Sequence, residues 1–134
     1  MKISISAFIT AKTGNKISEC EDAFSISTDR RVIAVSDGVS QSFYPNVWSR
    51  ILCDYFTKSP EEFFQEEKQT INSDCTKQYR EEVEKIFNSL PESKKRLVRV
   101  SQSKFPNGGA ATFVGLQVIE DRIQIDCIGD SVLF

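Results

Sequence analysis

The stretch that decides the fold covers residues 21–38 and reads EDAFSISTDRRVIAVSDG. Within it, residues 23–28 and 31–36 are short alternating runs on either side of an Asp-Arg pair, which is typical of two strands joined by a tight turn. A two-residue turn places Asp22 directly opposite Asp37 and puts both on the more apolar face of the hairpin. The same turn sets two apolar cross-strand pairs, Phe24 with Val35 and Ile26 with Ile33.

Two opposed carboxylates need a physical reason. Directly opposed side chains lie about 4.5–5.5 Å apart at Cβ, and like charges at that distance are destabilising. A hard divalent cation between or near Asp22 and Asp37 is the commonest way to relieve the repulsion. The alternative is that the two acids only end their strands as turn and cap residues. The spacing leaves both interpretations open.

The segments before and after this hairpin indicate a mixed α and β domain. Residues 3–10 alternate like a half-buried strand. Apolar residues at helical spacing, with a proline in the first turn, predict a helix over 45–58. A second helix is expected to begin after Ser59 as its cap, and a third to run from a break at 72–74 as far as Pro91.

The C-terminal third is expected to return to strands. Residues 91–107 form a basic, poorly periodic connector, which could contact phosphoprotein or nucleic acid or be a solvated, mobile loop. Residues 110–119 and 122–128 predict a second hairpin around Glu120-Asp121. This order predicts helices packed on an antiparallel sheet, or on one side of a two-sheet sandwich, in one domain over residues 1–134. The end of the chain is strand-like, as if cut within a strand.

Composition narrows the class of protein. The net charge of −2 gives no bulk electrostatic case for binding nucleic acid or an anionic membrane. There is no apolar run of about 18 residues, and the start lacks the apolar core of a signal peptide.

The four cysteines form no metal-ligand spacing, so we expect reduced thiols in a cytoplasmic protein. The chain has no histidine, which excludes Ser-His-Asp and Cys-His mechanisms and the usual zinc hydrolase sites.

Four short segments fall into one order along the chain: CEDAF at 20–24, VSDGV at 35–39, GGAAT at 108–112 and IGDS at 128–131. In this order they resemble the metal-dependent PP2C-type (PPM) serine/threonine protein phosphatases. The resemblance covers nearly the whole chain but only the first half to two-thirds of a family domain. It implies an antiparallel β-sandwich flanked by helices, truncated at its C-terminus.

The resemblance also implies an activity and a set of site residues. Family members hydrolyse phosphoprotein by attack of a hydroxide that bridges two Mn²⁺ or Mg²⁺ ions. Asp37 matches the bridging aspartate and Gly38 the glycine whose carbonyl is a ligand. Glu21 matches the glutamate that reaches the second metal, partly through water, and Asp22 the acid that orients metal-bound water. Further matches support the motifs: Gly108, Gly109 and Thr112 at a turn and strand start, and Asp130 and Ser131 beside the metal centre.

Two departures from the family pattern bear on activity. The arginine that holds the substrate phosphate has no counterpart, and Lys12 and Lys16 stand in that region instead. Lys16 is our candidate phosphate contact, although lysine lacks the bidentate fork and a plain surface lysine is the alternative. The family's later metal aspartates lie beyond the last residue here, so we expect weak metal binding and little turnover from these 134 residues.

Two other classes of function stay open. One is a catalytically silent PP2C-like module that binds or regulates a partner. The other is a small α+β binding domain whose acids only cap strands. The sequence identifies neither a particular phosphoprotein substrate nor an oligomeric state.

Overall fold

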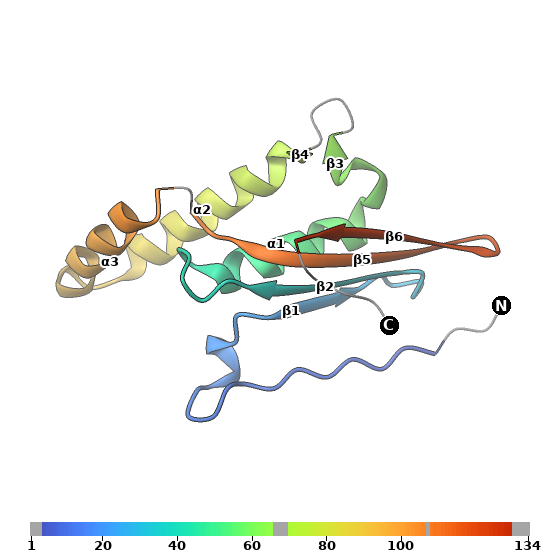
Figure 1. Cartoon of the computed structure of the whole chain (residues 1–134). Helices are drawn as coiled ribbons and strands as arrows, with labels where there is room; N and C mark the ends of the chain where they lie inside the picture. Colours follow the sequence, from blue (N-terminus) through green and yellow to red (C-terminus); the bar gives the residue numbers. More distant parts are fainter. Residues whose placement is uncertain (1–3, 66–69, 107, 130–134) are drawn as a thin grey trace.

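The computed structural model describes residues 4–65, 70–106 and 108–129 and has a mixed α+β architecture (Figure 1). Two 3-10 turns, Ile17–Glu19 (η1) and Pro60–Glu62 (η2), accompany the regular elements. The strands are β1 (Ala23–Ile26), β2 (Val32–Gly38), β3 (Phe64–Gln65), β4 (Thr70–Ile71), β5 (Ala111–Ile119) and β6 (Arg122–Ile128). The helices are α1 (Pro45–Lys58), α2 (Ser73–Ser89) and α3 (Glu92–Lys104).

Four strands form one antiparallel sheet in the order β1-β2-β5-β6. Both hairpins have the predicted register, because the position of each turn and the alternation of apolar residues indicate the same strand pairing. Phe24 pairs with Val35 in the first hairpin, and Leu116 pairs with Ile125 in the second. The second hairpin turns at Glu120, which has a φ of 53°. The central strands β2 and β5 join the two hairpins, with Asp37 paired to Thr112.

One face of the sheet is covered by α1, and α2 lies beyond α1 (Figure 1). Helix α1 has the predicted bounds, begins with Pro45 at its first position and buries an apolar stripe against the sheet. Its Phe56 ring lies 5.2 Å from that of Phe63 and 5.2 Å from that of Phe113, and all three side chains are fully buried. Gly115 on β5 makes room for this cluster, because a Cβ there would lie 2.5 Å from the Phe56 ring.

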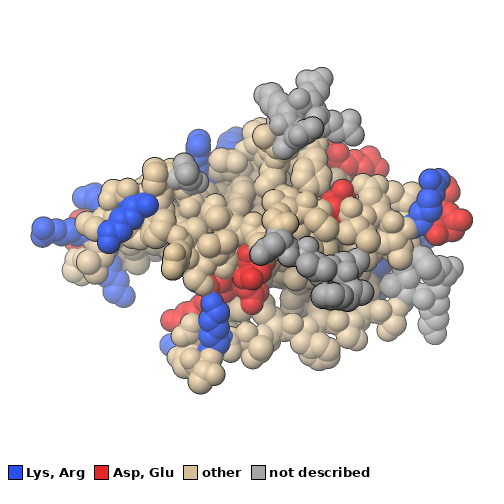
Figure 2. Space-filling model, in the orientation of Figure 1, with Lys and Arg blue, Asp and Glu red and all other residues tan. Residues whose placement is uncertain are grey.

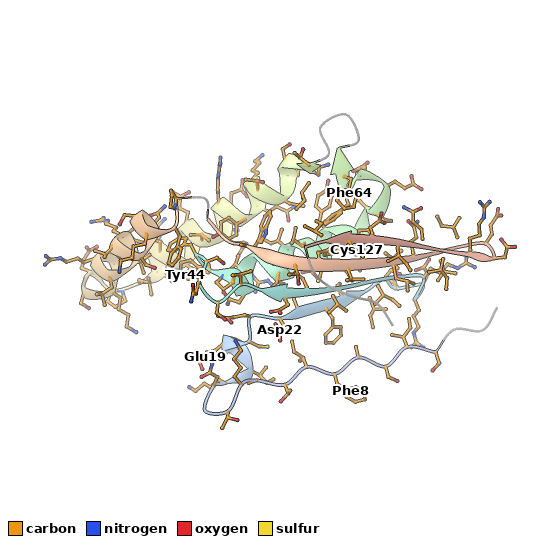
Figure 3. All side chains as sticks on the ribbon, viewed as in Figure 1. Phe8, Glu19, Asp22, Tyr44, Phe64 and Cys127 are labelled. Atoms are coloured by element: carbon orange, nitrogen blue, oxygen red, sulfur yellow. The ribbon has the colours of Figure 1, made fainter. Side chains whose placement is uncertain are left out.

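The opposite face of the sheet is apolar and only partly covered. Residues 4–10 run along it (Figure 1), and a groove of about 1080 Å³ separates this segment from the strands. Val35 and Ile123 on this face remain 53% exposed each. Phe8, in the segment, points away from the sheet and is 93% exposed (Figure 3).

Three predicted elements are wrong. Residues 4–10 of the predicted strand 3–10 form no ladder, although their sequence alternates. After Ser59 the chain makes the turn η2 and the short β3–β4 hairpin in place of a helix, and no Ser59 side-chain cap forms. The predicted connector 91–107 is largely the helix α3, which has no buried residue. Within the described ranges, none of the helices has the length and apolar character needed to cross a membrane.

Candidate functional site

The two aspartates of the first hairpin meet at one end of the sheet. The β1–β2 ladder pairs Ala23 with Ser36, and one further step of that antiparallel register sets Asp22 opposite Asp37. Figure 3 shows Asp22 just before β1, at the edge that faces the N-terminal segment. The predicted opposition of two carboxylates therefore follows from the observed register.

The electrostatics of Asp22 agree with this arrangement. Partial burial raises the pKa of the Asp22 carboxyl, and a hydrogen bond to Asp37 and the negative charge of Asp37 raise the pKa further. The Cys20 thiol lies 3.9 Å from Asp22 Oδ2 and opposes the shift weakly. A carboxyl with a raised pKa beside a second carboxyl is a common arrangement for proton transfer.

Glu21 is held by a lysine and a serine. Lys12 Nζ lies 2.9 Å from Glu21 Oε2 and 3.1 Å from Ser40 Oγ, and Ser40 Oγ in turn donates to the same Glu21 oxygen. The Ser40 hydrogen bond, followed by that from Lys12, lowers the pKa of Glu21. The pKa of Lys12 is raised, chiefly by its hydrogen bond to Glu21 and that residue's charge, with smaller contributions from Asp22 and Asp37. The Lys12 ammonium thus interacts with all three acids.

The phosphate contact expected at Lys16 has a different setting. Lys16 is the cap residue of η1, and its backbone N–H donates to Glu19 Oε2 at 2.8 Å. The lysine that the fold brings to the acids is Lys12. Sequence reasoning had placed both lysines in the right region, but no spacing rule distinguishes them, because the irregular chain between residues 11 and 20 decides which one points inward. Ser40, in the loop after β2, is a second partner of Glu21 that the sequence analysis did not identify.

Gly38 is required by close packing at the start of α1. A Cβ at Gly38 would lie 2.6 Å from the Glu21 carbonyl oxygen and 2.9 Å from Pro45 Cβ. The Gly38 N–H donates to the Glu21 carbonyl at 3.2 Å, and the buried Ser49 hydroxyl donates to the same oxygen at 2.6 Å. These two hydrogen bonds therefore hold the end of the first hairpin against the first turns of α1. They fix the backbone of Glu21 and Gly38 beside the acidic side chains.

The other predicted motif residues lie around this end of the sheet. Thr112 is the cross-strand partner of Asp37. Gly108 has a φ of 82°, its N–H donates to the Phe105 carbonyl at 3.0 Å, and a Cβ there would lie 3.2 Å from the Tyr79 ring. A Cβ at Gly109 would lie 2.8 Å from Trp48 Cβ, so the chain passes too close to α1 for a side chain. Asp130 and Ser131 lie outside the described residues.

The oxygen donors of this site have the chemistry that hard cations such as Mg²⁺ and Mn²⁺ prefer. Their number is too small, however. In the part of the chain that the structure describes, no group of three or more His, Cys, Asp or Glu side chains is arranged to hold a metal ion. Asp22 and Asp37 face each other, while Glu21 is engaged by Lys12. The described residues therefore form no complete metal site by themselves.

Two of the four cysteines, Cys53 and Cys75, are buried. All four cysteines, each within the described ranges, are free as predicted. Burial raises the pKa of Cys53 and of Cys75 to about 12, so both thiols stay protonated and unreactive at neutral pH.

Comparison with family models, curated proteins and solved structures finds no match to this chain. The resemblance to PP2C-type phosphatases therefore depends on the four ordered motifs.

Proposed function

We propose that these residues belong to a metal-dependent phosphomonoester hydrolase of the PP2C type that acts on phosphoprotein. The observation that carries the proposal is the opposition of Asp22 and Asp37 at the end of the sheet, beside a backbone pinned at Gly38. Three of the four motifs meet there: the first two supply this acidic end, and the third supplies Thr112, which pairs with Asp37. The proposed fold is the family's sandwich, in which further strands would cover the partly exposed face of the sheet.

The roles of the residues follow from their chemistry. Asp37, the Gly38 carbonyl and Glu21 would hold Mn²⁺ or Mg²⁺ together with ligands that the described residues do not supply. When bound, the cations lower the pKa of water and neutralise phosphoryl oxygens. Asp22, whose pKa is raised, is suited to accept a proton from water at neutral pH. Lys12, which pairs with Glu21 beside these acids, would have to exchange that partner to contact the substrate phosphate.

A catalytically silent PP2C-like module is the second candidate. One observation favours it: Lys12 and Ser40 already occupy the Glu21 carboxylate, which the active family uses toward a metal. The positive charge of Lys12 partly neutralises the acidic end of the sheet without a divalent cation. The two candidates differ in whether phosphate chemistry depends on Asp37.

Binding and turnover are tested together on the 134-residue chain. We expect millimolar Mn²⁺ to broaden the amide NMR signals of residues 21–22 and 37–38 selectively, and p-nitrophenyl phosphate to be hydrolysed slowly and only with Mn²⁺. Asp37→Asn should abolish the selective broadening and lower the hydrolysis rate at least about 100-fold, because one carboxylate ligand is lost. Asp121→Asn, in the exposed β5–β6 turn, is the matched control and should change neither.

The outcomes separate the candidates. Broadening that Asp37→Asn removes, without any Mn²⁺-dependent hydrolysis, would support the silent module. Broadening spread equally over residues 120–122, together with hydrolysis that survives Asp37→Asn, would defeat both the site and the proposed activity.

A further inference from the structure

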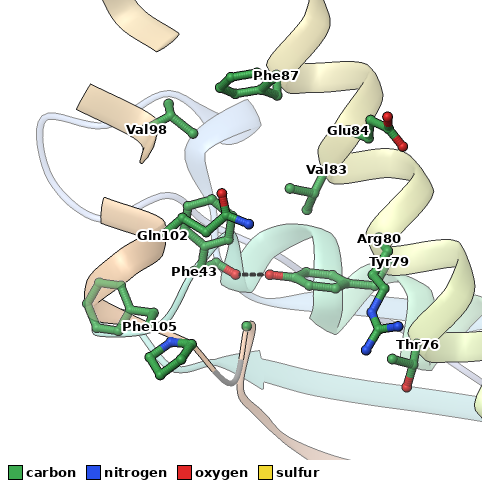
Figure 4. A pocket seen from close by; sticks show the side chains of 12 residues that line it. Phe43, Thr76, Tyr79, Arg80, Val83, Glu84, Phe87, Val98, Gln102 and Phe105 are labelled. Carbon is green, nitrogen blue, oxygen red and sulfur yellow. Dashed lines mark hydrogen bonds between the residues drawn. The ribbon is translucent and has the colours of Figure 1, made fainter. Parts of the chain in front are cut away.

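A pocket of about 390 Å³ opens between α2 and α3, away from the acidic site (Figure 4). Its volume lies in the range of about 300–1,000 Å³ that is usual for small-molecule sites. Its walls are mainly apolar and aromatic and come from both helices and from the loop before α1: Phe43, Tyr79, Val83, Phe87, Val98 and Phe105.

The floor of the pocket is preformed. The Tyr79 hydroxyl donates to the Phe43 carbonyl oxygen, and the Phe43 N–H donates to the Gly108 carbonyl at 3.2 Å. The Tyr79 ring also packs edge-on against Trp48 with a centroid distance of 5.4 Å. Burial raises the pKa of Tyr79 to about 12, so its hydroxyl remains a donor throughout the neutral range. A ligand would therefore meet a fixed aromatic surface at low cost in ordering the protein.

The charges around the pocket favour an anion. Arg80 lies on the α2 wall, and no carboxylate among the described residues is within 4.0 Å of its guanidinium. At the Phe87 end, Arg99 Cζ and Lys95 Nζ lie 5.4 and 5.8 Å from the ring centre, and Lys95 is paired with Glu92 at 3.0 Å. Figure 2 shows Lys and Arg side chains gathered at the end of the molecule where α3 lies. Glu84 is the one acid in the wall, one helical turn from Arg80, and its charge partly offsets that of Arg80.

We propose that this pocket binds a small planar apolar molecule carrying one carboxylate, with the ring system against Tyr79 and Phe105 and the carboxylate at Arg80. Aromatic walls favour a planar body, because offset and edge-on ring contacts add to the apolar area buried. The guanidinium favours a carboxylate over a neutral group, because it can donate two parallel hydrogen bonds to it. This site is independent of the phosphatase proposal and shares none of its acidic residues.

The test uses two probes of nearly equal shape, 2-naphthoate and its neutral amide, 2-naphthamide. Each is titrated into ¹⁵N-labelled protein, and amide shifts are followed. We expect saturable shifts at residues 43, 79, 98, 105 and 108, and a dissociation constant for 2-naphthoate about tenfold below that for 2-naphthamide. Arg80→Gln should remove this tenfold preference and leave the affinity for 2-naphthamide unchanged. Arg122→Gln, on β6, is the control and should alter neither affinity.

A second set of variants tests the cavity itself. Val98→Trp fills the pocket from α3 and should abolish binding of both probes. Should Val98→Trp lose its dispersed spectrum, Val83→Phe fills the pocket from α2 and serves the same purpose. Equal affinity for the two probes, equal weakening of both by Arg80→Gln, shifts centred on Val35 and Ile123, or no saturation at millimolar probe would each overturn the proposal.

Discussion

At the scale of single residues, the acidic end of the sheet combines repulsion between Asp22 and Asp37 with partial compensation of their charge by Lys12. Asp22 and Asp37 oppose each other across the hairpin, and Lys12 interacts with both of them at longer range than with Glu21. An exposed ion pair such as Lys12–Glu21 contributes little to stability in water. The repulsion between the aspartates should therefore be measurable in the stability of the fold.

We predict that Asp22→Asn stabilises the protein at neutral pH. The pKa of Asp22 is higher in the folded chain than in the unfolded one, so the native state binds this proton more tightly and loses stability as pH rises through that pKa. Below the unfolded value of about 3.9, the group is protonated in both states and the charge repulsion is absent. The free energy of unfolding should rise by about 0.5 kcal/mol at pH 7 and by much less at pH 3.

Urea unfolding followed by Trp48 fluorescence measures this difference at both pH values. Asp121→Asn, in an exposed turn, is the control for removing a negative charge and should show no such pH dependence. Equal effects of Asp22→Asn at pH 7 and pH 3 would mean that the aspartates do not repel each other.

Gly38 gives a steric prediction at the same scale. Gly38→Ala places a Cβ 2.6 Å from a backbone carbonyl oxygen, which a side-chain rotation cannot relieve. We expect a loss of about 1–3 kcal/mol in the free energy of unfolding, as is usual for overpacking. Val39→Ala, at the next and exposed position, should cost far less. A loss at Gly38 no greater than that at Val39 would contradict the observed contact with Glu21.

At the scale of elements, helices and strands were predicted correctly from the sequence where a local signal, such as a turn or a helix start, agreed with the pattern of burial. The two hairpins were predictable in register because an apolar alternation with period two fixes which residues face each other once the turn is placed. Helix α1 was predictable because Pro45 marks its start and its apolar stripe is buried. Asn72 caps α2 by accepting from the Asp74 N–H at 3.0 Å, at the break that the sequence indicated.

The elements that sequence reasoning missed lack that agreement. Residues 4–10 alternate, but a strand needs a neighbouring ladder, which their sequence does not specify. Phe63 and Phe64 suited a helical stripe, yet Phe63 instead anchors the aromatic core from a turn. Helix α3 has too few apolar residues for a clear stripe, and the Lys12 contact depends on an irregular segment. Tertiary contacts decide the other three cases, whereas α3 forms without burying any residue.

Helix α3 should be the least stable of the three helices. It has no buried residue, and Leu97 on its surface is 71% exposed, whereas Leu52 in α1 is fully buried. Few buried contacts imply easy local opening. We predict amide hydrogen-exchange protection in α3 at least about tenfold below that in α1, measured by NMR at pH 6. Equal protection in the two helices would show that α3 opens only with the whole fold.

At the scale of the whole molecule, the two faces of the sheet are unequal. The face against α1 contains the aromatic core, while the other face leaves apolar side chains partly exposed, among them Phe24 at 39% and Ile125 at 46%. Contiguous apolar surface of this kind drives association of soluble proteins. We therefore predict that a protein of these 134 residues self-associates through this face as its concentration rises.

The double variant Val35→Thr and Ile123→Thr tests this prediction without breaking the sheet, because threonine favours strands and removes apolar surface on one face only. Sedimentation velocity over a concentration series should show the wild-type weight-average mass rising and the variant's staying near that of one chain. The matched control replaces two exposed apolar residues elsewhere, Leu97→Gln and Val100→Gln on α3, which are 71% and 52% exposed in the native chain. Since α3 does not adjoin the uncovered face, this control should associate as the wild type does. Equal suppression of association by both double variants would assign the association to general surface hydrophobicity. If the wild type does not associate at all, residues 4–10 cover the sheet well enough by themselves.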